Sequence, residues 1–292
     1  MPTLLQIRKK AILLLQQGAN DTARLDVDLL LEEALQISPL DLILEPNRKI
    51  SAAEADHFQA FLNRRLAHEP IAHILGRKEF WRHSFKVSRH CLTPRPDSET
   101  LIEAALKVVR DKTAALKIGD FGTGSGCLLL SLMAELPNSL GVGVDISQKA
   151  LALAKVNAEA LGLSAQCQFI LSDWAENIPA EVKFDIILCN PPYIAEKDAM
   201  DLAPDVRDYE PHQALFAKEA GLREYKKLAK IMPGLLSPSG HVFMEIGHEQ
   251  GQEVAAIFKE GGAQNVKILQ DLAGRDRCVV FNFKRKTPLL KK

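Results

Sequence analysis

The sequence predicts an α/β protein in which a doubly wound, mostly parallel sheet follows a small helical domain. Apolar residues recur at helical spacing over residues 1–75, and strand and helix patterns then alternate from residue 116 onwards. The last two strands lack a helix between them. Because strands joined through helices pair in parallel, we expect helices on both faces of the sheet and an antiparallel pair at one edge.

The individual elements follow from these patterns. In the helical domain, the third helix starts at a capping box in which Ser51 and Glu54 satisfy exposed backbone N–H groups. Residues 80–87 alternate apolar and polar side chains, which predicts a short hairpin. Seven strands are expected at 116–121, 140–145, 166–170, 184–189, 241–246, 265–270 and 277–283, with helices at 126–135, 147–161, 219–235 and 249–261.

These patterns divide the chain into three parts. Residues 1–75 form the helical domain, residues 76–90 a hairpin linker that begins at Gly76, and residues 91–292 the sheet domain. The histidines of the helical domain lack acidic or cysteine partners at metal-ligand spacing. We therefore expect no metal ion and assign the chemistry to residues 91–292.

The composition excludes several classes of protein. The chain has 292 residues, with 37 Lys and Arg against 37 Asp and Glu, and 47% of its residues are apolar. This length fits about two domains and this apolar content fits buried cores, which excludes disordered and fibrous proteins. A formal net charge of zero provides no field that would hold the protein on DNA or on an anionic membrane.

The cysteines and the N-terminus predict a cytoplasmic protein. The five cysteines are widely spaced and never form a C-x-x-C pair, so neither a disulfide framework nor a zinc site is indicated. The first residues show no signal-peptide pattern, and no apolar run approaches the ~20 residues of a membrane span. We expect buried thiols in a reducing compartment.

A glycine-rich loop follows the first strand of the sheet and indicates a nucleoside-containing cofactor. It consists of Gly122, Thr123, Gly124, Ser125 and Gly126, and the next strand ends 19 positions later at Asp145. Glycines allow a ligand to approach the backbone, and a carboxylate at a strand end can accept hydrogen bonds from both ribose hydroxyls of an adenosine.

The spacing of these glycines distinguishes two cofactors. A dinucleotide site requires G-x-G-x-x-G, so that a pyrophosphate can bind at a helix N-terminus, but the loop is G-x-G-x-G and position 127 is Cys. S-adenosylmethionine has no phosphate to hold. The pattern therefore favours S-adenosylmethionine.

Three further acidic or aromatic residues are candidates for cofactor contacts. Asp120 precedes the loop and either meets the cationic amino group of the cofactor's methionine part or caps the turn. Asp173 and Trp174 follow the third strand, where they can contact the adenine edge and provide a flat apolar wall. A core position is the alternative for Trp174.

The strongest local motif is Asn190, Pro191, Pro192 and Tyr193, directly after the apolar strand 184–189. Two prolines cannot continue a central strand, so they fix a rigid loop at the carboxyl end of the sheet, where ligands of such folds bind. The Asn190 side-chain oxygen and the Pro191 carbonyl form two acceptors for a planar NH2 group, on which Tyr193 can stack. This arrangement suits methylation of a conjugated nitrogen, because positioning and fixed dipoles supply much of the rate.

Together with these motifs, several other segments resemble the HemK/PrmC family, the bacterial protein-(glutamine-N5) methyltransferases that act on peptide chain release factors. The resemblance runs over essentially the whole chain. It includes Leu92-Thr93-Pro94-Arg95-Pro96-Asp97-Ser98-Glu99, Asp205-Val206-Arg207-Asp208-Tyr209-Glu210-Pro211, Glu245-Ile246-Gly247-His248-Glu249-Gln250-Gly251 and Asp271-Leu272-Ala273-Gly274-Arg275-Asp276-Arg277.

The resemblance implies a fold, a cofactor and a substrate. The fold would be Rossmann-like, a class I S-adenosylmethionine-dependent methyltransferase with seven strands, and the substrate the glutamine of the Gly-Gly-Gln motif in class I release factors. Residues 122–126, Asp145, Trp174 and Asn190 would contact the cofactor, and residues 190–193 would hold the glutamine. Arg95 would belong to a wall over the cofactor or to a surface salt bridge. The helical domain would contact the release factor.

Two alternatives use the same motifs. A nucleic-acid adenine methyltransferase would flip a base into the 190–193 pocket, but it would need many phosphate-neutralising Lys and Arg, and the balanced charge disfavours it. A module that merely binds S-adenosylmethionine would not require the motif that begins at Asn190. We therefore expect a protein substrate, with no nucleic-acid substrate and no membrane partner.

Overall fold

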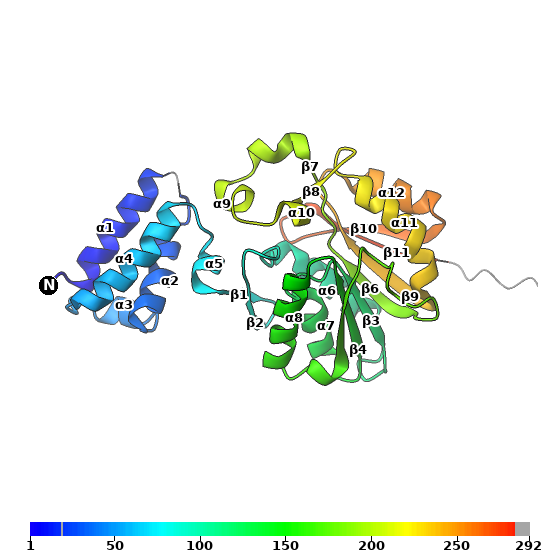
Figure 1. Ribbon diagram of the computed structural model, residues 1–292, viewed down its shortest axis with the longest axis horizontal. Helices are drawn as coiled ribbons and strands as arrows, with labels where there is room; N and C mark the ends of the chain where they lie inside the picture. Colours follow the sequence, from blue (N-terminus) through cyan, green and yellow to red (C-terminus); the bar gives the residue numbers. More distant parts are fainter. Residues whose placement is uncertain (19, 284–292) are drawn as a thin grey trace, which may run out of the picture. The chain divides into compact units, whose positions relative to one another are not determined.

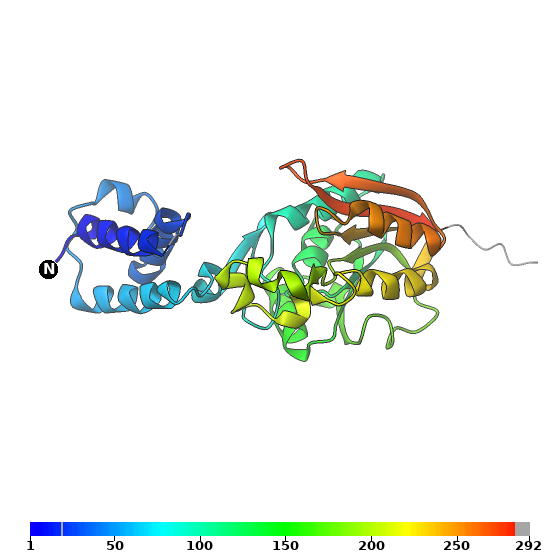
Figure 2. The ribbon, with the colours of Figure 1, turned by 90° about the horizontal axis from the view of Figure 1, so that it is seen from above.

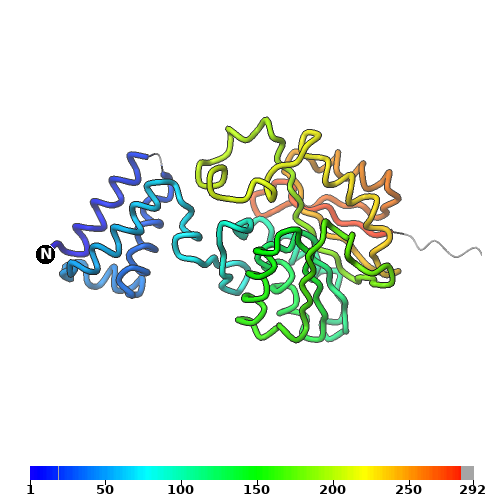
Figure 3. Tube along the Cα trace, in the orientation of Figure 1, coloured from blue at the N-terminus to red at the C-terminus, as the bar shows by residue number. Residues whose placement is uncertain are grey.

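The computed structural model describes residues 1–18 and 20–283, and these form two compact units. The first comprises Met1–Arg77 and Ala203–Tyr209, and the second comprises Lys78–Leu202 and the chain from Glu210 onwards. Figure 3 traces the path of the chain between them. This division differs from the predicted one in two places. The hairpin belongs to the second unit from Lys78, and the segment 203–209 belongs to the first.

The first unit is helical and has its own core. Its helices are α1 (Leu4–Gln17), α2 (Ala23–Leu35), α3 (Asp41–Leu44), α4 (Ala52–Leu66), α5 (Ile71–Leu75) and α9 (Pro204–Arg207). Fully buried side chains such as Val27, Leu30 and Leu31 pack against Phe58. The predicted capping box at the start of α4 is confirmed. Although it lies late in the sequence, segment 203–209 is held here by the Tyr209 hydroxyl, which donates to the Ala67 carbonyl at 2.5 Å.

The second unit is built on a seven-stranded sheet, as predicted. Its strands are β3 (Lys117–Phe121), β4 (Leu140–Asp145), β5 (Cys167–Leu171), β6 (Phe184–Cys189), β9 (Leu236–Glu245), β10 (Ala263–Gln270) and β11 (Asp276–Phe283). They lie in the order β10-β11-β9-β6-β3-β4-β5. The antiparallel pairings are confined to one edge, because β11 runs antiparallel to both β9 and β10. β11 is therefore the reversed strand, and β10 is the edge itself.

Helices cover both faces of this sheet (Figures 1 and 2). One core packs α11 (Arg223–Leu235) and α12 (Gly251–Glu260) against the sheet, and the other packs α6 (Glu99–Val108) and α7 (Cys127–Glu135). α8 (Gln148–Ala160) joins the second of these cores through Ala158. With both faces buried, the central strands are almost entirely apolar, as parallel strands usually are.

Short elements complete the second unit. β1 (Arg77–Phe80) and β2 (His83–Lys86) form a two-stranded sheet, and β7 (Ile194–Ala195) and β8 (Phe216–Ala217) form another. The remaining pieces are η1 (Pro96–Ser98), η2 (Ser164–Gln166), η3 (Glu196–Asp201) and α10 (His212–Leu215). The β1–β2 turn is anchored to the helical layer, because Trp81 donates from its backbone N–H to Glu99 at 2.7 Å and from its indole N–H to Glu135 at 3.0 Å.

One buried side chain connects the hairpin to the loop after β3. Asn157 on α8 is 2% exposed. Its amide NH2 donates to the Lys86 carbonyl at 3.0 Å and to the Ser125 carbonyl at 2.8 Å, and its oxygen accepts from the Lys86 N–H at 2.8 Å. Asn157 therefore fixes the glycine-rich loop from behind.

We expect Asn157→Ala to destabilise the second unit by about 2–4 kcal/mol, because it leaves the Ser125 carbonyl, where the bond is buried, and the two backbone groups of Lys86, where the bonds are partly buried, without these partners. For a domain of this size, that loss lowers the midpoint of thermal unfolding by about 5–15 °C. Calorimetry of the full chain measures it. The exposed Asn138, which makes a single hydrogen bond to the Thr113 carbonyl, provides the matched Asn138→Ala control. Equal midpoints for the two variants would contradict the role of Asn157.

Candidate active site

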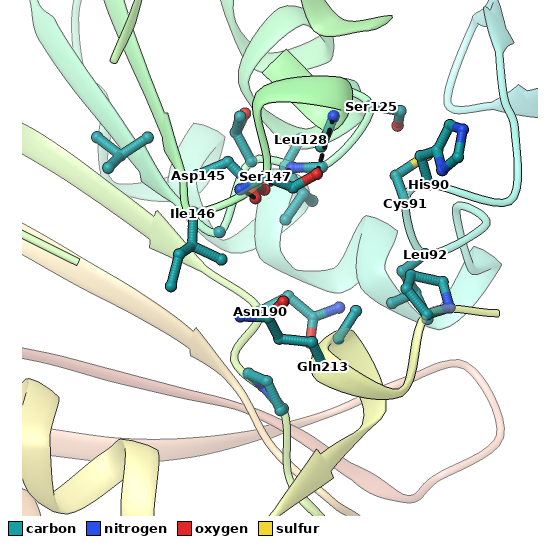
Figure 4. A pocket seen from close by; sticks show the side chains of 18 of the residues that line it. His90, Cys91, Leu92, Ser125, Leu128, Asp145, Ile146, Ser147, Asn190 and Gln213 are labelled. Carbon is teal, nitrogen blue, oxygen red and sulfur yellow. Dashed lines mark hydrogen bonds between the residues drawn. The ribbon is translucent and has the colours of Figure 1, made fainter. Parts of the chain in front are cut away.

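A cavity of about 400 Å³ opens at the carboxyl ends of β3, β4, β5 and β6 (Figure 4). This is the edge where ligands of doubly wound sheets bind, and the volume lies within the range of small-molecule sites. Every residue that lines it belongs to the second unit. The loops that form it follow the strands that the sequence predicts.

Most of the predicted site residues line this cavity. They are Arg95, Gly122, Thr123, Gly124, Ser125, Asp145, Asp173, Trp174, Asn190 and Pro192. Gly126, Pro191 and Tyr193 are not among the lining residues. The motifs after β3, β4, β5 and β6 therefore converge on one cavity, as their positions at strand ends predict.

The glycine-rich loop depends on left-handed backbone at its three glycines. Gly122, Gly124 and Gly126 have φ of 80°, 55° and 81°, which side chains rarely adopt. A Cβ on Gly122 would lie 3.7 Å from both the Asn190 carbonyl oxygen and the Trp174 ring, so it would fill the space between them. Gly126 instead serves packing, because a Cβ there would lie 3.1 Å from Leu130 at the start of α7.

Asp145 lies at the end of β4 and accepts two backbone hydrogen bonds. Its two oxygens accept from the Gly124 N–H and the Ser147 N–H, both at 2.8 Å. Burial raises the pKa of its carboxyl, while these two bonds act in the opposite direction. Each carboxylate oxygen can accept more than one hydrogen bond, so Asp145 retains acceptor capacity toward the cavity.

Asp120 lies beneath the loop rather than in the cavity. It is 1% exposed, and its Oδ2 accepts from the Thr123 hydroxyl at 2.6 Å. Its Oδ1 has no hydrogen-bond partner among the described residues, and burial raises the pKa of the carboxyl to about 7. Of the two predicted roles, the structure supports the turn-capping one, because Asp120 does not line the cavity.

Trp174 packs against the glycine-rich loop, and two contacts hold its side chain in place. Its ring faces Gly122, and its indole N–H donates to Glu224 at 2.9 Å. Lys227 lies 3.4 Å from Glu224 and 4.0 Å from Asp173. Glu224 and Lys227 also line the cavity. No motif in the sequence marks them, because they lie on the amphipathic helix α11 and look like ordinary surface charges.

Arg95 has two kinds of contact that bear on its predicted roles. Arg95 lines the cavity and also forms an ion pair with Glu210 at 2.7 Å. The Glu210 side chain is only 1% exposed. This pair attaches the segment that leads into α10 to the wall of the cavity, where Gln213 also contributes (Figure 4). The two partners lie 115 positions apart in the sequence, which explains why no local pattern revealed the pair.

Asn190 follows β6 directly and projects into the cavity (Figure 4). Its side-chain amide makes no hydrogen bond to any residue that the structure describes. Tyr193 takes a different direction from the predicted stacking position. Its hydroxyl lies 3.4 Å from Glu245 Oε1, and its backbone carbonyl accepts from the Gln250 amide at 3.1 Å. Pro191 and Pro192 lie between Asn190 and Tyr193, whose side chains point in different directions.

Within residues 1–18 and 20–283, no three His, Cys, Asp or Glu side chains are grouped so that they could hold a metal ion. In the same residues, no helix has the length and apolar content needed to cross a membrane. All five cysteines carry free thiols.

The chain matches two known families over separate regions. Residues 6–76 match the PrmC N-terminal domain, and residues 98–205 match the methyltransferase small domain. The fold resembles that of a methyltransferase from Pyrococcus furiosus, with a TM-score of 0.51 and 14% identity, covering 78% of this chain and 98% of the other. That likeness concerns the fold alone.

Two relatives extend over nearly the whole chain. The release factor glutamine methyltransferase of Rhodospirillum rubrum is 39% identical over 266 residues, which cover 91% of this chain and 81% of the relative. The enzyme of the same name from Cereibacter sphaeroides is 41% identical over 262 residues, or 90% of this chain and 91% of the relative. This chain therefore belongs to the release factor glutamine methyltransferase family, as its motifs predicted, and it has the Rossmann-like methyltransferase fold.

Proposed function

We propose that this enzyme uses S-adenosylmethionine to methylate the side-chain amide nitrogen of the glutamine in the Gly-Gly-Gln motif of class I peptide chain release factors. One observation carries the proposal. The unpaired carboxamide of Asn190 projects into the same cavity that is bounded by the glycine-rich loop and Asp145. A site for a planar amide thus adjoins a site for a nucleoside.

The residues of the cavity fit the cofactor. Gly122 leaves open the space that a Cβ would fill between Trp174 and Asn190, and Asp145 offers acceptors suited to ribose hydroxyls. Trp174 provides an apolar face for the base, and Asp173 a polar edge beside it. Arg95 lines the cavity, and its ion pair with Glu210 holds it there. When bound, S-adenosylmethionine supplies an electrophilic methyl group.

Asn190 and Pro191 would hold the substrate amide through its two N–H groups. An amide nitrogen is a poor nucleophile because its lone pair is delocalised into the carbonyl. The two acceptors would be the Asn190 side-chain oxygen, which faces the cavity, and the carbonyl of Pro191, which follows it in the chain and does not itself line the cavity. Together they would favour a more pyramidal nitrogen and direct its lone pair toward the methyl group. The amide proton becomes acidic only as the nitrogen gains positive charge, so no strong base is needed beforehand.

The remaining parts of the proposal concern partners and location. The helical unit, which matches the PrmC N-terminal domain, would contact the release factor. The equal numbers of acidic and basic residues favour a protein over a nucleic acid as substrate. Five free cysteines fit a reducing compartment such as the cytoplasm.

A side-by-side methylation assay tests the proposal. Purified enzyme with methyl-labelled S-adenosylmethionine is expected to label a release factor and to leave unlabelled a variant whose Gly-Gly-Gln glutamine is changed to alanine. DNA and RNA are offered in parallel and are expected to remain unlabelled. Equal labelling of both release factors would refute the glutamine assignment, and labelled DNA or RNA would indicate an adenine methyltransferase.

A further inference from the structure

A buried carboxyl group lies directly behind the loop that carries Asn190. Glu245 is the last residue of β9, and it is 2% exposed. β9 pairs in parallel with β6, with Met244 opposite Cys189, so Glu245 lies at the level where Asn190 leaves the sheet. It does not line the cavity. Any effect that it has on a substrate must therefore pass through its neighbours.

Two neighbours of Glu245 belong to segments that contribute residues to the cavity. The Tyr193 hydroxyl lies 3.4 Å from Glu245 Oε1, and Tyr193 ends the loop that carries Asn190. Ser98 also acts on the Glu245 carboxyl and lowers its pKa, and Ser98 lines the cavity in the segment that follows Arg95. Glu245 thus supports the loop after β6 from behind, close to the segment that contains Arg95.

The surroundings of Glu245 make its charge costly. Its Oε2 has no hydrogen-bond partner among the described residues, and burial raises its pKa to about 7. The nearest cation is Arg277, whose guanidinium lies 3.1 Å from Asp97 and 3.3 Å from Asp271. A glutamine would fit this space without the cost of a buried charge. Costly buried carboxyls of this kind are typical of functional sites.

We propose that Glu245 is a positioning residue for methyl transfer, which accepts the hydrogen bond of the Tyr193 hydroxyl and so holds the loop that carries Asn190 in place from behind. The proposal rests on the function given above. It assigns Tyr193 to the support of the loop, where its hydroxyl faces inward, rather than to contact with the substrate.

Ionisation of Glu245 adds a pH dependence to this role. The carboxylate accepts the Tyr193 hydrogen bond with full charge, and protonation weakens it. The titratable or charged groups around it are Tyr193, Tyr225 on α11, Arg277 on β11, Asp97 in η1, and the thiols of Cys189 and Cys278. We therefore expect kcat to fall as the pH is lowered through about 7.

The test compares full-length wild-type enzyme with Glu245→Gln, Tyr193→Phe and the double variant, using release factor and S-adenosylmethionine from pH 6 to 9. We expect kcat at pH 8 to be about tenfold lower in each single variant, with the KM for release factor changed less than about twofold. The double variant should lose little more, because the two residues act through one contact. The step in kcat near pH 7 should be absent from Glu245→Gln and from the double variant, both of which lack the carboxyl.

A stability measurement separates positioning from structural damage. A raised pKa in the folded state stabilises the protein at low pH, and this contribution is lost as the pH rises through about 7. Glu245→Gln should therefore unfold at a higher temperature than wild type at pH 8, with a smaller difference at pH 5. A less active yet more stable variant supports the proposal. The exposed Glu253 on α12 provides the Glu253→Gln control, for which neither quantity should change.

Two results would overturn the inference. Wild-type kcat with an unchanged pH profile in Glu245→Gln would show that the carboxyl does not act on the reaction. A loss of activity accompanied by a lower unfolding temperature at pH 8 would show that Glu245 is structural. Failure of the wild-type enzyme to label the release factor would instead refute the proposed function, and that outcome is recognised before any variant is compared.

Discussion

Asn190→Ala is expected to lower kcat for release factor methylation by about 10²–10³-fold while leaving the Kd of S-adenosylmethionine within about threefold of the wild-type value. The Asn190 side chain makes no hydrogen bond to the described protein, so its removal leaves no buried group unpaired. The loss falls on the reaction, because removal of one fixed dipole from such a site typically costs about 3–4 kcal/mol of transition-state stabilisation. Single-turnover kinetics measure the chemical step, and calorimetric titration measures cofactor binding.

Two further variants serve as comparisons for Asn190→Ala. Asn138→Ala removes an exposed asparagine far along the chain and should retain wild-type kcat. Asn190→Asp keeps an acceptor oxygen but adds a negative charge, so we expect activity between that of wild type and Asn190→Ala. Unchanged turnover in Asn190→Ala would remove the proposed role of this side chain, whatever the state of cofactor binding.

Much of the sheet could be predicted because its strands are buried on both faces. β4 and β6 have the predicted bounds, since continuous apolar runs end at clear turn residues. β9 begins at Leu236, five residues before the predicted start at 241. The intervening residues include Pro238 and Gly240, which resemble a turn, yet they form an irregular part of the strand where its register with β6 shifts.

The site was predictable only where its residues are contiguous in the sequence. The glycine-rich loop and Asp145 each follow a strand, and parallel strands bring their ends together. Contacts such as Arg95 with Glu210 join residues 115 apart, and Tyr209 with Ala67 joins residues 142 apart. No local pattern encodes such pairs, because either partner alone resembles a surface side chain.

The orientation of the Tyr193 side chain is a second feature that the sequence could not predict. The sequence shows that an aromatic residue follows two prolines, which favours a stacking role by residue type alone. In the structure, the ring packs against the core behind the loop, and its hydroxyl approaches Glu245. The rotamer of a side chain depends on the space that distant strands leave for it, here on β9.

The second large effect is expected for cofactor binding, which Asp145→Ala should weaken by about 10²-fold or more. In the proposed function, both ribose hydroxyls donate to this carboxylate, and hydrogen bonds to a charged group are each worth about 1.5–3 kcal/mol. The variant also releases the Gly124 N–H, which the carboxylate holds at 2.8 Å. The glycine-rich loop would then lose one of the contacts that fix its shape.

Asp145→Asn separates the charge from the shape of the side chain. It keeps the size of Asp145 but replaces one acceptor oxygen by an NH2 donor. The one remaining oxygen cannot accept from both the Gly124 and Ser147 N–H groups and also from two ribose hydroxyls. We expect its Kd to lie closer to that of Asp145→Ala than to that of wild type. Asp21→Ala, an exposed substitution in the helical unit, is the control. Calorimetric titration with S-adenosylmethionine gives all four values, and wild-type affinity in Asp145→Ala would exclude Asp145 from the cofactor site. Asn190→Ala is expected to lower kcat with the cofactor still bound, whereas Asp145→Ala is expected to weaken cofactor binding itself. These opposite effects would locate the cofactor and the substrate amide at the two ends of one cavity.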